Sequence, residues 1–235
     1  MAKRDREKMM LAEHVLEVRH EASGTFLDVR GFIADYIRKD GFLPHWKIDS
    51  NVVNFRDHKD GIKLEGAFVG YKSAGYVVLN PATRNFFLER ATAFWKLLLK
   101  NKHYEIPEPA RFGARTKIFV PSTKSFDAIN KVMWEELFTQ KIRNLIGGTG
   151  TDLRFTIELK QKSFDVRVIG GPIHKDEAGR YFQFTSEEFK KSGLFLDIDI
   201  YQTDGLSHAE IPRMLKETVD MTWEKTERVA SGLGL

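Results

Sequence analysis

Three cationic side chains share one face of a predicted strand near the middle of the chain. Polar and apolar residues alternate from Arg111 to Pro121, which places every second side chain on the same side of an extended backbone. The residues on the polar side are Arg111, Gly113, Arg115 and Lys117. A glycine among cations lets a ligand approach the backbone, so this face is a candidate site for a phosphate or carboxylate. The alternative is that these cations form ion pairs with acidic residues of a neighbouring strand.

Two carboxylates occupy one face of another predicted strand near the C-terminal end of the sequence. Asp197 and Asp199 alternate with Leu196, Ile198 and Ile200, so both point to the same side. Carboxylate oxygens are the ligands that divalent cations prefer, which makes the pair a weak candidate metal site. If this strand neighbours the cationic strand, the same aspartates instead neutralise Arg111 and Arg115. We expect this second arrangement.

Catalytic motifs of the common enzyme classes do not occur in the sequence. The glycine-rich segment 147–150 follows a predicted helix and precedes a strand, the reverse of a phosphate-binding loop, so it is interpreted as a helix stop. The seven histidines show no zinc-protease spacing, and no serine nucleophile motif is found. The chain contains no cysteine, which excludes disulfides and thiolate chemistry. No cofactor is predicted.

Composition is typical of a globular protein of 235 residues, with a net charge of +4. The small excess of basic residues is spread along the chain, which weakens a nucleic-acid interpretation because such proteins usually concentrate basic residues in a patch. No apolar run approaches the ~20 residues of a membrane-spanning helix. The first residues mix both charges without a following apolar stretch, so no signal peptide is predicted. A cytoplasmic location is expected.

The order of predicted elements indicates an α+β fold built from two similar modules. Each module consists of a strand, a helix, further strands and a second helix, with a largely antiparallel sheet and helices packed on one face. The expected divisions are a polar tail (1–11), a first module (12–106), a proline-containing connector (107–110), a second module (111–230) and a short tail (231–235). The modules could form one compact domain, and whether they share one sheet is left open.

Several boundaries follow from local signals. Asn80 and Pro81 predict the start of an amphipathic helix. A single long helix is expected to begin after Ser122 or Thr123 and to continue to Leu145. A short strand is predicted over 181–185, and helical turns over 186–191.

Three short motifs resemble a bacterial family of "sporadically distributed" proteins. They are AEHVLEVR at 12–19, Arg111-x-Gly113-x-Arg115 after an aromatic helix, and LDIDIY at 196–201 before the last helix. The family has no established activity, so the resemblance implies no catalytic residues. Its patchy distribution implies an association with mobile elements or defence islands.

Taken together, these features favour a non-enzymatic binding or sensing protein, with the resemblance adding a role in anti-phage defence. A protein partner or a homo-oligomer is expected. The first alternative is nucleic-acid binding through a set of basic residues: Lys3, Arg4, Arg6, Arg111, Arg115, Lys117 and Lys124. The second is a metal-dependent phosphoester-processing enzyme that uses Asp197 and Asp199.

Overall fold

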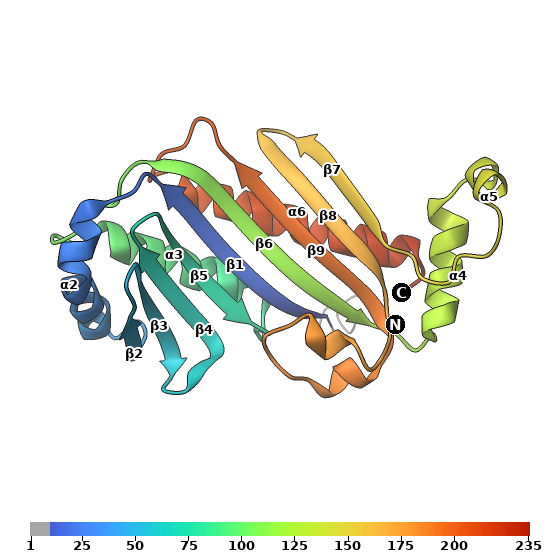
Figure 1. Cartoon of the computed structure of the whole chain (residues 1–235), viewed down its shortest axis with the longest axis horizontal. Helices are drawn as coiled ribbons and strands as arrows, with labels where there is room; N and C mark the ends of the chain where they lie inside the picture. Colours follow the sequence, from blue (N-terminus) through green and yellow to red (C-terminus); the bar gives the residue numbers. More distant parts are fainter. Residues whose placement is uncertain (1–9) are drawn as a thin grey trace.

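A single antiparallel sheet of nine strands forms the body of the molecule in a computed structural model, which describes residues 10–235 (Figure 1). The strand order across the sheet is β2-β3-β4-β5-β1-β6-β9-β8-β7. The strands are β1 (Leu11–His20), β2 (His45–Ile48), β3 (Val52–His58), β4 (Gly61–Gly70), β5 (Ser73–Leu79), β6 (Pro109–Pro121), β7 (Phe155–Gln161), β8 (Phe164–Ile173) and β9 (Gly193–Gln202). The predicted α+β class is confirmed.

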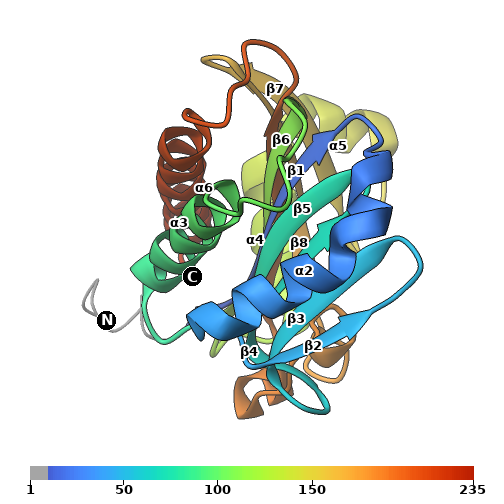
Figure 2. The same ribbon diagram turned by 90° about the vertical axis from the view of Figure 1, so that its left-hand side faces the viewer.

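Helices pack against one face of this sheet (Figures 1 and 2). The helices of the described residues are α2 (Gly24–Asp40), α3 (Arg84–Leu99), α4 (Phe126–Leu137), α5 (Gln140–Ile146) and α6 (Ile211–Gly232). Buried side chains of α2, α3, α4 and α6 join alternate residues of the strands in one apolar cluster. We call this side the helix face and the opposite side the open face.

The two halves of the chain share one sheet and one core. The first strand of each half meets the other at the centre, where β1 pairs with β6 over the length of β1. Leu16 and Val18 of β1, with Phe112 and Ile118 of β6, point to the helix face and lie in the same cluster. The division into two similar modules stays a prediction. The two halves do not have separate cores, because their buried residues belong to one cluster.

A second, smaller apolar cluster covers one end of the open face. The connection between β8 and β9 folds back over the sheet as two short 3-10 helices, η1 (Ala178–Arg180) and η2 (Glu187–Lys190). Its rings at Phe182 and Phe189 pack on Phe119 and Phe195 of the central strands. We call residues 174–192 the covering loop. No strand forms over 181–185, contrary to the prediction, because these aromatic side chains pack downward onto the sheet.

Local capping explains the other differences from the predicted elements. The expected long helix is broken at Phe138, whose extended backbone is followed by Thr139; the Thr139 hydroxyl accepts a hydrogen bond from the Ile142 N–H and starts α5. Asn80 does not begin a helix: its φ of 47° makes a left-handed turn, and α3 begins at Arg84.

At the C-terminus, α6 continues to Gly232, and the Leu233 side chain is buried in the main core. The expected tail at 231–235 is therefore part of the packed structure. At the other end, β1 already begins at Leu11, a residue assigned by the sequence to the polar tail. The short edge strand β2 was not predicted.

His14 is a neutral histidine enclosed in the core. Its side chain on β1 is 1% exposed, its Nδ1 lies 3.0 Å from the Thr116 hydroxyl, and its ring stacks on Phe87 at a centroid distance of 4.8 Å. Burial lowers the pKa of His14 to about 3. The side chain therefore stays uncharged in the folded protein over the physiological pH range.

This burial predicts a stability that falls in mild acid. Below pH 6.5, His14 becomes protonated in the unfolded chain. In the folded protein it stays neutral down to about pH 3. The free energy of unfolding therefore decreases through this window by up to ~1.4 kcal/mol per pH unit. In urea unfolding, the free energy of unfolding should fall between pH 7 and pH 5. This fall should be smaller by about 2 kcal/mol in His14→Gln than in the unmodified protein. The exposed His103→Gln variant serves as the control, and equal pH slopes in all three proteins would contradict the prediction.

Candidate functional site

Charges of opposite sign alternate across the open face. The strand register aligns Glu158 of β7, Arg167 of β8, Asp199 of β9 and Arg115 of β6 in one row. A second row contains Asp197, Lys117 and Glu13. Directly opposed residues of unlike charge stabilise neighbouring strands. The open face over β1 and β6 to β9 is thus a charged surface that largely neutralises itself.

The cations of β6 and the aspartates of β9 meet, as the sequence predicts. Arg115 donates two hydrogen bonds to Asp197, from Nε at 2.8 Å and from an Nη at 2.5 Å. Arg111 donates to Asp199 at 3.4 Å. The pairs are diagonal, because Arg115 lies directly opposite Asp199 in the register. The bidentate pair raises the pKa of Arg115 further.

Lys117 contacts the covering loop. Its Nζ donates to Glu13 at 2.9 Å and to the Tyr181 carbonyl oxygen at 3.1 Å. The other Glu13 oxygen accepts from the Gln183 N–H at 2.8 Å, and the Glu13 side chain is 2% exposed. Glu13 and Lys117 therefore form a buried clamp that fixes residues 181–183 to the sheet. No sequence signal indicates this clamp, because its members come from three distant segments.

Loss of the clamp should release the covering loop. In Glu13→Gln, Lys117 keeps its charge in a largely buried position without a carboxylate, so we expect the free energy of unfolding to fall by about 2–4 kcal/mol. Hydrogen exchange should become faster at the Gln183 amide. The control is Glu17→Gln, which removes a carboxylate further along the same face of β1, where the side chain is 28% exposed. If both variants exchange at the same rate over 181–183, the clamp has no such role.

Gly113 makes room for the side chain of Arg111. A Cβ atom at Gly113 would lie 2.7 Å from the Arg111 Nη1, closer than such atoms normally approach. The guanidinium therefore lies across the backbone of its own strand, where it also packs against the Tyr201 ring at 4.6 Å. The sequence predicted that the glycine admits a close approach. The group that approaches is Arg111 itself.

Arg19 is a functional candidate that the sequence analysis missed. It lies on β1 directly opposite Arg111 in the β1–β6 register, so two residues of like charge face each other. The Arg19 side chain is 56% exposed and contacts Glu17 at 2.8 Å, and the same carboxylate oxygen lies 3.9 Å from Arg111. Like charges in opposed positions are unfavourable unless an anion lies near both, and Glu17 is the internal anion of this pair. Only the register between strands far apart in sequence could have revealed it.

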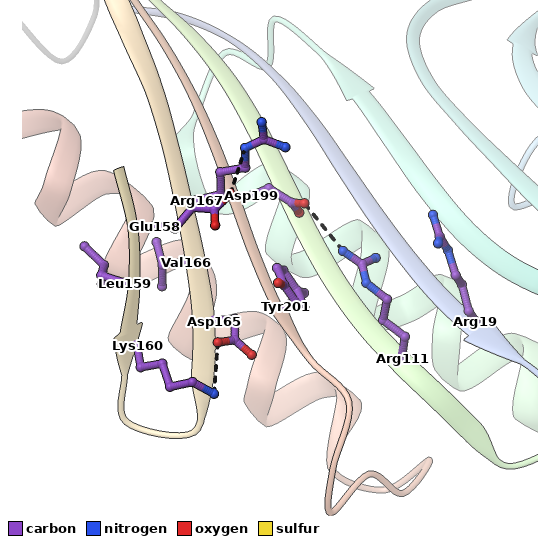
Figure 3. A pocket seen from close by; sticks show the side chains of 10 residues that line it. All are labelled: Arg19, Arg111, Glu158, Leu159, Lys160, Asp165, Val166, Arg167, Asp199 and Tyr201. Atoms are coloured by element: carbon purple, nitrogen blue, oxygen red, sulfur yellow. Dashed lines mark hydrogen bonds and ion pairs between the residues drawn. The ribbon is translucent and has the colours of Figure 1, made fainter. Parts of the chain in front are cut away.

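A groove of about 610 Å³ runs from these arginines towards the sheet edge (Figure 3). Its lining residues are Arg19, Arg111, Glu158, Leu159, Lys160, Asp165, Val166, Arg167, Asp199 and Tyr201. A smaller hollow of about 190 Å³ adjoins it over Gly113 and Arg115 and shares Arg19, Arg111 and Asp199 with the groove. The two hollows meet at the opposed arginines.

Asp199 is the acidic group at this junction. Burial raises the pKa of its carboxyl, although the positive charges of Arg111 and Arg115 act in the opposite direction. The carboxylate is thus partly desolvated and competes for Arg111 with any anion that enters the groove. Protonation of Asp199 would remove that competition.

The remaining candidates from the sequence do not assemble into a site. Within residues 10–235, no three His, Asp or Glu side chains are grouped so as to hold a metal ion, and both Asp197 and Asp199 are engaged by arginines. Gly147 and Gly148 have φ values of 71° and 73° and end α5, as expected for a helix stop. Lys124 donates to the Leu233 carbonyl oxygen at 3.3 Å. Lys3, Arg4 and Arg6 lie outside the described residues.

Sequence comparison with known proteins provides no independent guide to function. No protein-family model matches the sequence, and no curated protein shows a significant match to it. Among the helices of residues 10–235, none has the length and apolar character needed to cross a bilayer.

Proposed function

We propose that the chain is a non-catalytic binding protein whose groove receives the anionic group of a ligand between Arg19 and Arg111. The observation that carries this proposal is the placement of the two arginines opposite each other at the junction of two hollows. A carboxylate or phosphate can accept hydrogen bonds from both, and such charge-assisted bonds are the strong ones. In this proposal Arg115 and Lys117 stabilise the fold, through Asp197 and Glu13 respectively.

The ring of Tyr201 and the edge residues of β7 define the rest of the binding surface. Tyr201 packs beside Arg111 and offers an aromatic face to a bound group. Lys160 and Arg167 lie further along the groove, but Asp165 and Glu158 partner them at 3.2 Å and 3.5 Å. A ligand with one anionic group and a mixed or neutral remainder fits this surface better than a polyanion does.

The balance of charge is the reason that nucleic acid is not the preferred ligand. On β1 and β6 to β9, basic and acidic side chains of the open face are equal in number: Arg19, Arg111, Arg115, Lys117, Lys160 and Arg167 against Glu13, Glu17, Glu158, Asp165, Asp197 and Asp199. Nucleic-acid binding draws on an excess of positive charge facing the phosphates. A sensing role in cytoplasmic anti-phage defence remains part of the proposal on the strength of the sequence resemblance.

The binding test uses small anions and an acidic peptide. Titration with sulfate, pyrophosphate or a triglutamate peptide should shift the Nε–H resonances of Arg19 and Arg111 in NMR spectra. Arg111→Gln should weaken binding by about tenfold or more, as expected for the loss of a charge-assisted hydrogen bond. The matched control is Arg213→Gln on α6, an arginine with 60% side-chain exposure held by Glu210 and Glu217.

Competition from the Asp199 carboxylate predicts the direction in which anion affinity changes with pH. Sulfate keeps its charge between about pH 8 and pH 4, so its affinity should rise as the pH falls towards the raised pKa of Asp199. Asp199→Asn should bind sulfate more tightly at neutral pH and should lose most of the pH dependence. If even Asp199→Asn shows no anion-dependent shift at either arginine, the proposal is wrong. Turnover of nucleotides or phosphoesters in a substrate screen would overturn its non-catalytic part.

A further inference from the structure

Within residues 10–235, no strand pairs with the outer edge of β7, and two of its apolar side chains are exposed. This strand hydrogen-bonds to β8 on one side and is the last strand in the order. Ile157 is 50% exposed and Leu159 is 36% exposed, although their neighbours Val168 and Val166 on β8 belong to the buried core. An edge that presents free backbone groups beside apolar side chains is a template for another strand.

We propose that β7 pairs with β7 of a second copy, antiparallel and about a twofold axis at Leu159. This pairing sets Leu159 against Leu159 of the second copy. It also sets Glu158 opposite Lys160 in both directions, so a single register creates two ion pairs. A twofold interface must be complementary to itself, and this strand meets that condition.

The registers centred on the neighbouring residues lack this complementarity. Centring the pair on Glu158 opposes two glutamates, and centring it on Lys160 opposes two lysines. A centre at Ile157 places Lys160 opposite Arg154, just before the strand. The opposite sheet edge, β2, has four residues, of which Lys47 is charged at neutral pH, so self-pairing there offers no acidic partner. A centre at Thr156 would oppose Glu158 to Arg154 and Lys160 to Asp152, but it would pair only residues 155–157 within β7. The Leu159 centre is therefore the register that combines opposite charges with pairing over most of the strand.

The selected register also continues the charge pattern of the open face. Asp199, Arg167 and Glu158 alternate in sign up to the edge of the sheet. In the pair, Lys160 and then Asp165 of the second copy follow Glu158, so the alternation passes unbroken across the twofold axis. Glu158 and Lys160 are 73% and 84% exposed in one copy, so a second copy can contact them even while Arg167 and Asp165 do.

The proposed β7 pairing changes one wall of the anion groove, but it does not require a ligand in the groove. Glu158 and Lys160 form the outer wall of the groove, so a second copy would close that wall with its own β7 (Figure 3). The grooves of the two copies would then lie on the same side of one continuous sheet. This inference goes beyond the proposed function and stands or falls by different measurements.

A charge-exchange experiment tests the register directly. Sedimentation should find the unmodified protein in a concentration-dependent dimer, whereas Glu158→Lys alone and Lys160→Glu alone should each raise the dimer dissociation constant by about tenfold or more. Mixing the two variants should restore dimers, because two lysines of one chain then face two glutamates of the other in the proposed register. Recovery on mixing cannot come from a general loss of folding.

Cysteine cross-linking supplies an independent geometric test. The chain has no cysteine, so Leu159→Cys introduces a single thiol that meets its own counterpart at the twofold axis, within the Cα separation of ~4.4–6.8 Å that a disulfide requires. Ile157→Cys is the control on the same face, because its counterpart in the second copy lies opposite Gln161 and out of reach. We expect Leu159→Cys to oxidise to dimers about tenfold faster. A monomer at all concentrations, or equal cross-linking of both variants, would overturn the proposal.

Discussion

The pairing of β1 with β6 is the interaction on which the rest of the molecule depends. It joins residues about a hundred positions apart, from Leu11 opposite Phe119 to His20 opposite Pro109. Because side chains alternate along both strands, this one register directs the apolar residues to the helices and the charged residues to the open face. A shift of one residue would exchange the two faces and bury arginines beneath α3 and α6.

This register gathers many charged side chains on the open face, where ion pairs between neighbouring strands stabilise them. Many charged side chains come together on neighbouring strands, and several are partly removed from water. Cross-strand and diagonal ion pairs offset the cost of that desolvation, most completely between Arg115 and Asp197 and between Lys117 and Glu13. Arg19 and Arg111 are different, since the register places like charges together. Glu17 lies between them, 2.8 Å from Arg19 and 3.9 Å from Arg111, and it is the group that offsets their repulsion within the chain.

Alternation and capping signals were enough to predict most strands, the class of the fold and the meeting of β6 with β9. The strict pattern around Arg115 and Asp199 allowed each face to be assigned correctly. The clamp on the covering loop and the arginine pair were beyond prediction, because they depend on the register between strands that are distant in sequence. One part of the covering loop, 181–185, was mistaken for a strand, because its closely spaced aromatic residues are of the type that strands favour.

The clamp also has a consequence for how the protein is made. Glu13 and Gln183 are separated by 170 residues, yet they share a partly buried hydrogen bond. During synthesis the N-terminal strand leaves the ribosome long before the segment that will cover it exists, and contacts of such long range form late. Until then the Glu13 carboxylate is exposed to water, which solvates it well. The incomplete sheet therefore keeps a polar group at its centre. A charged residue at this position therefore protects the nascent chain from association before the last apolar surface is closed.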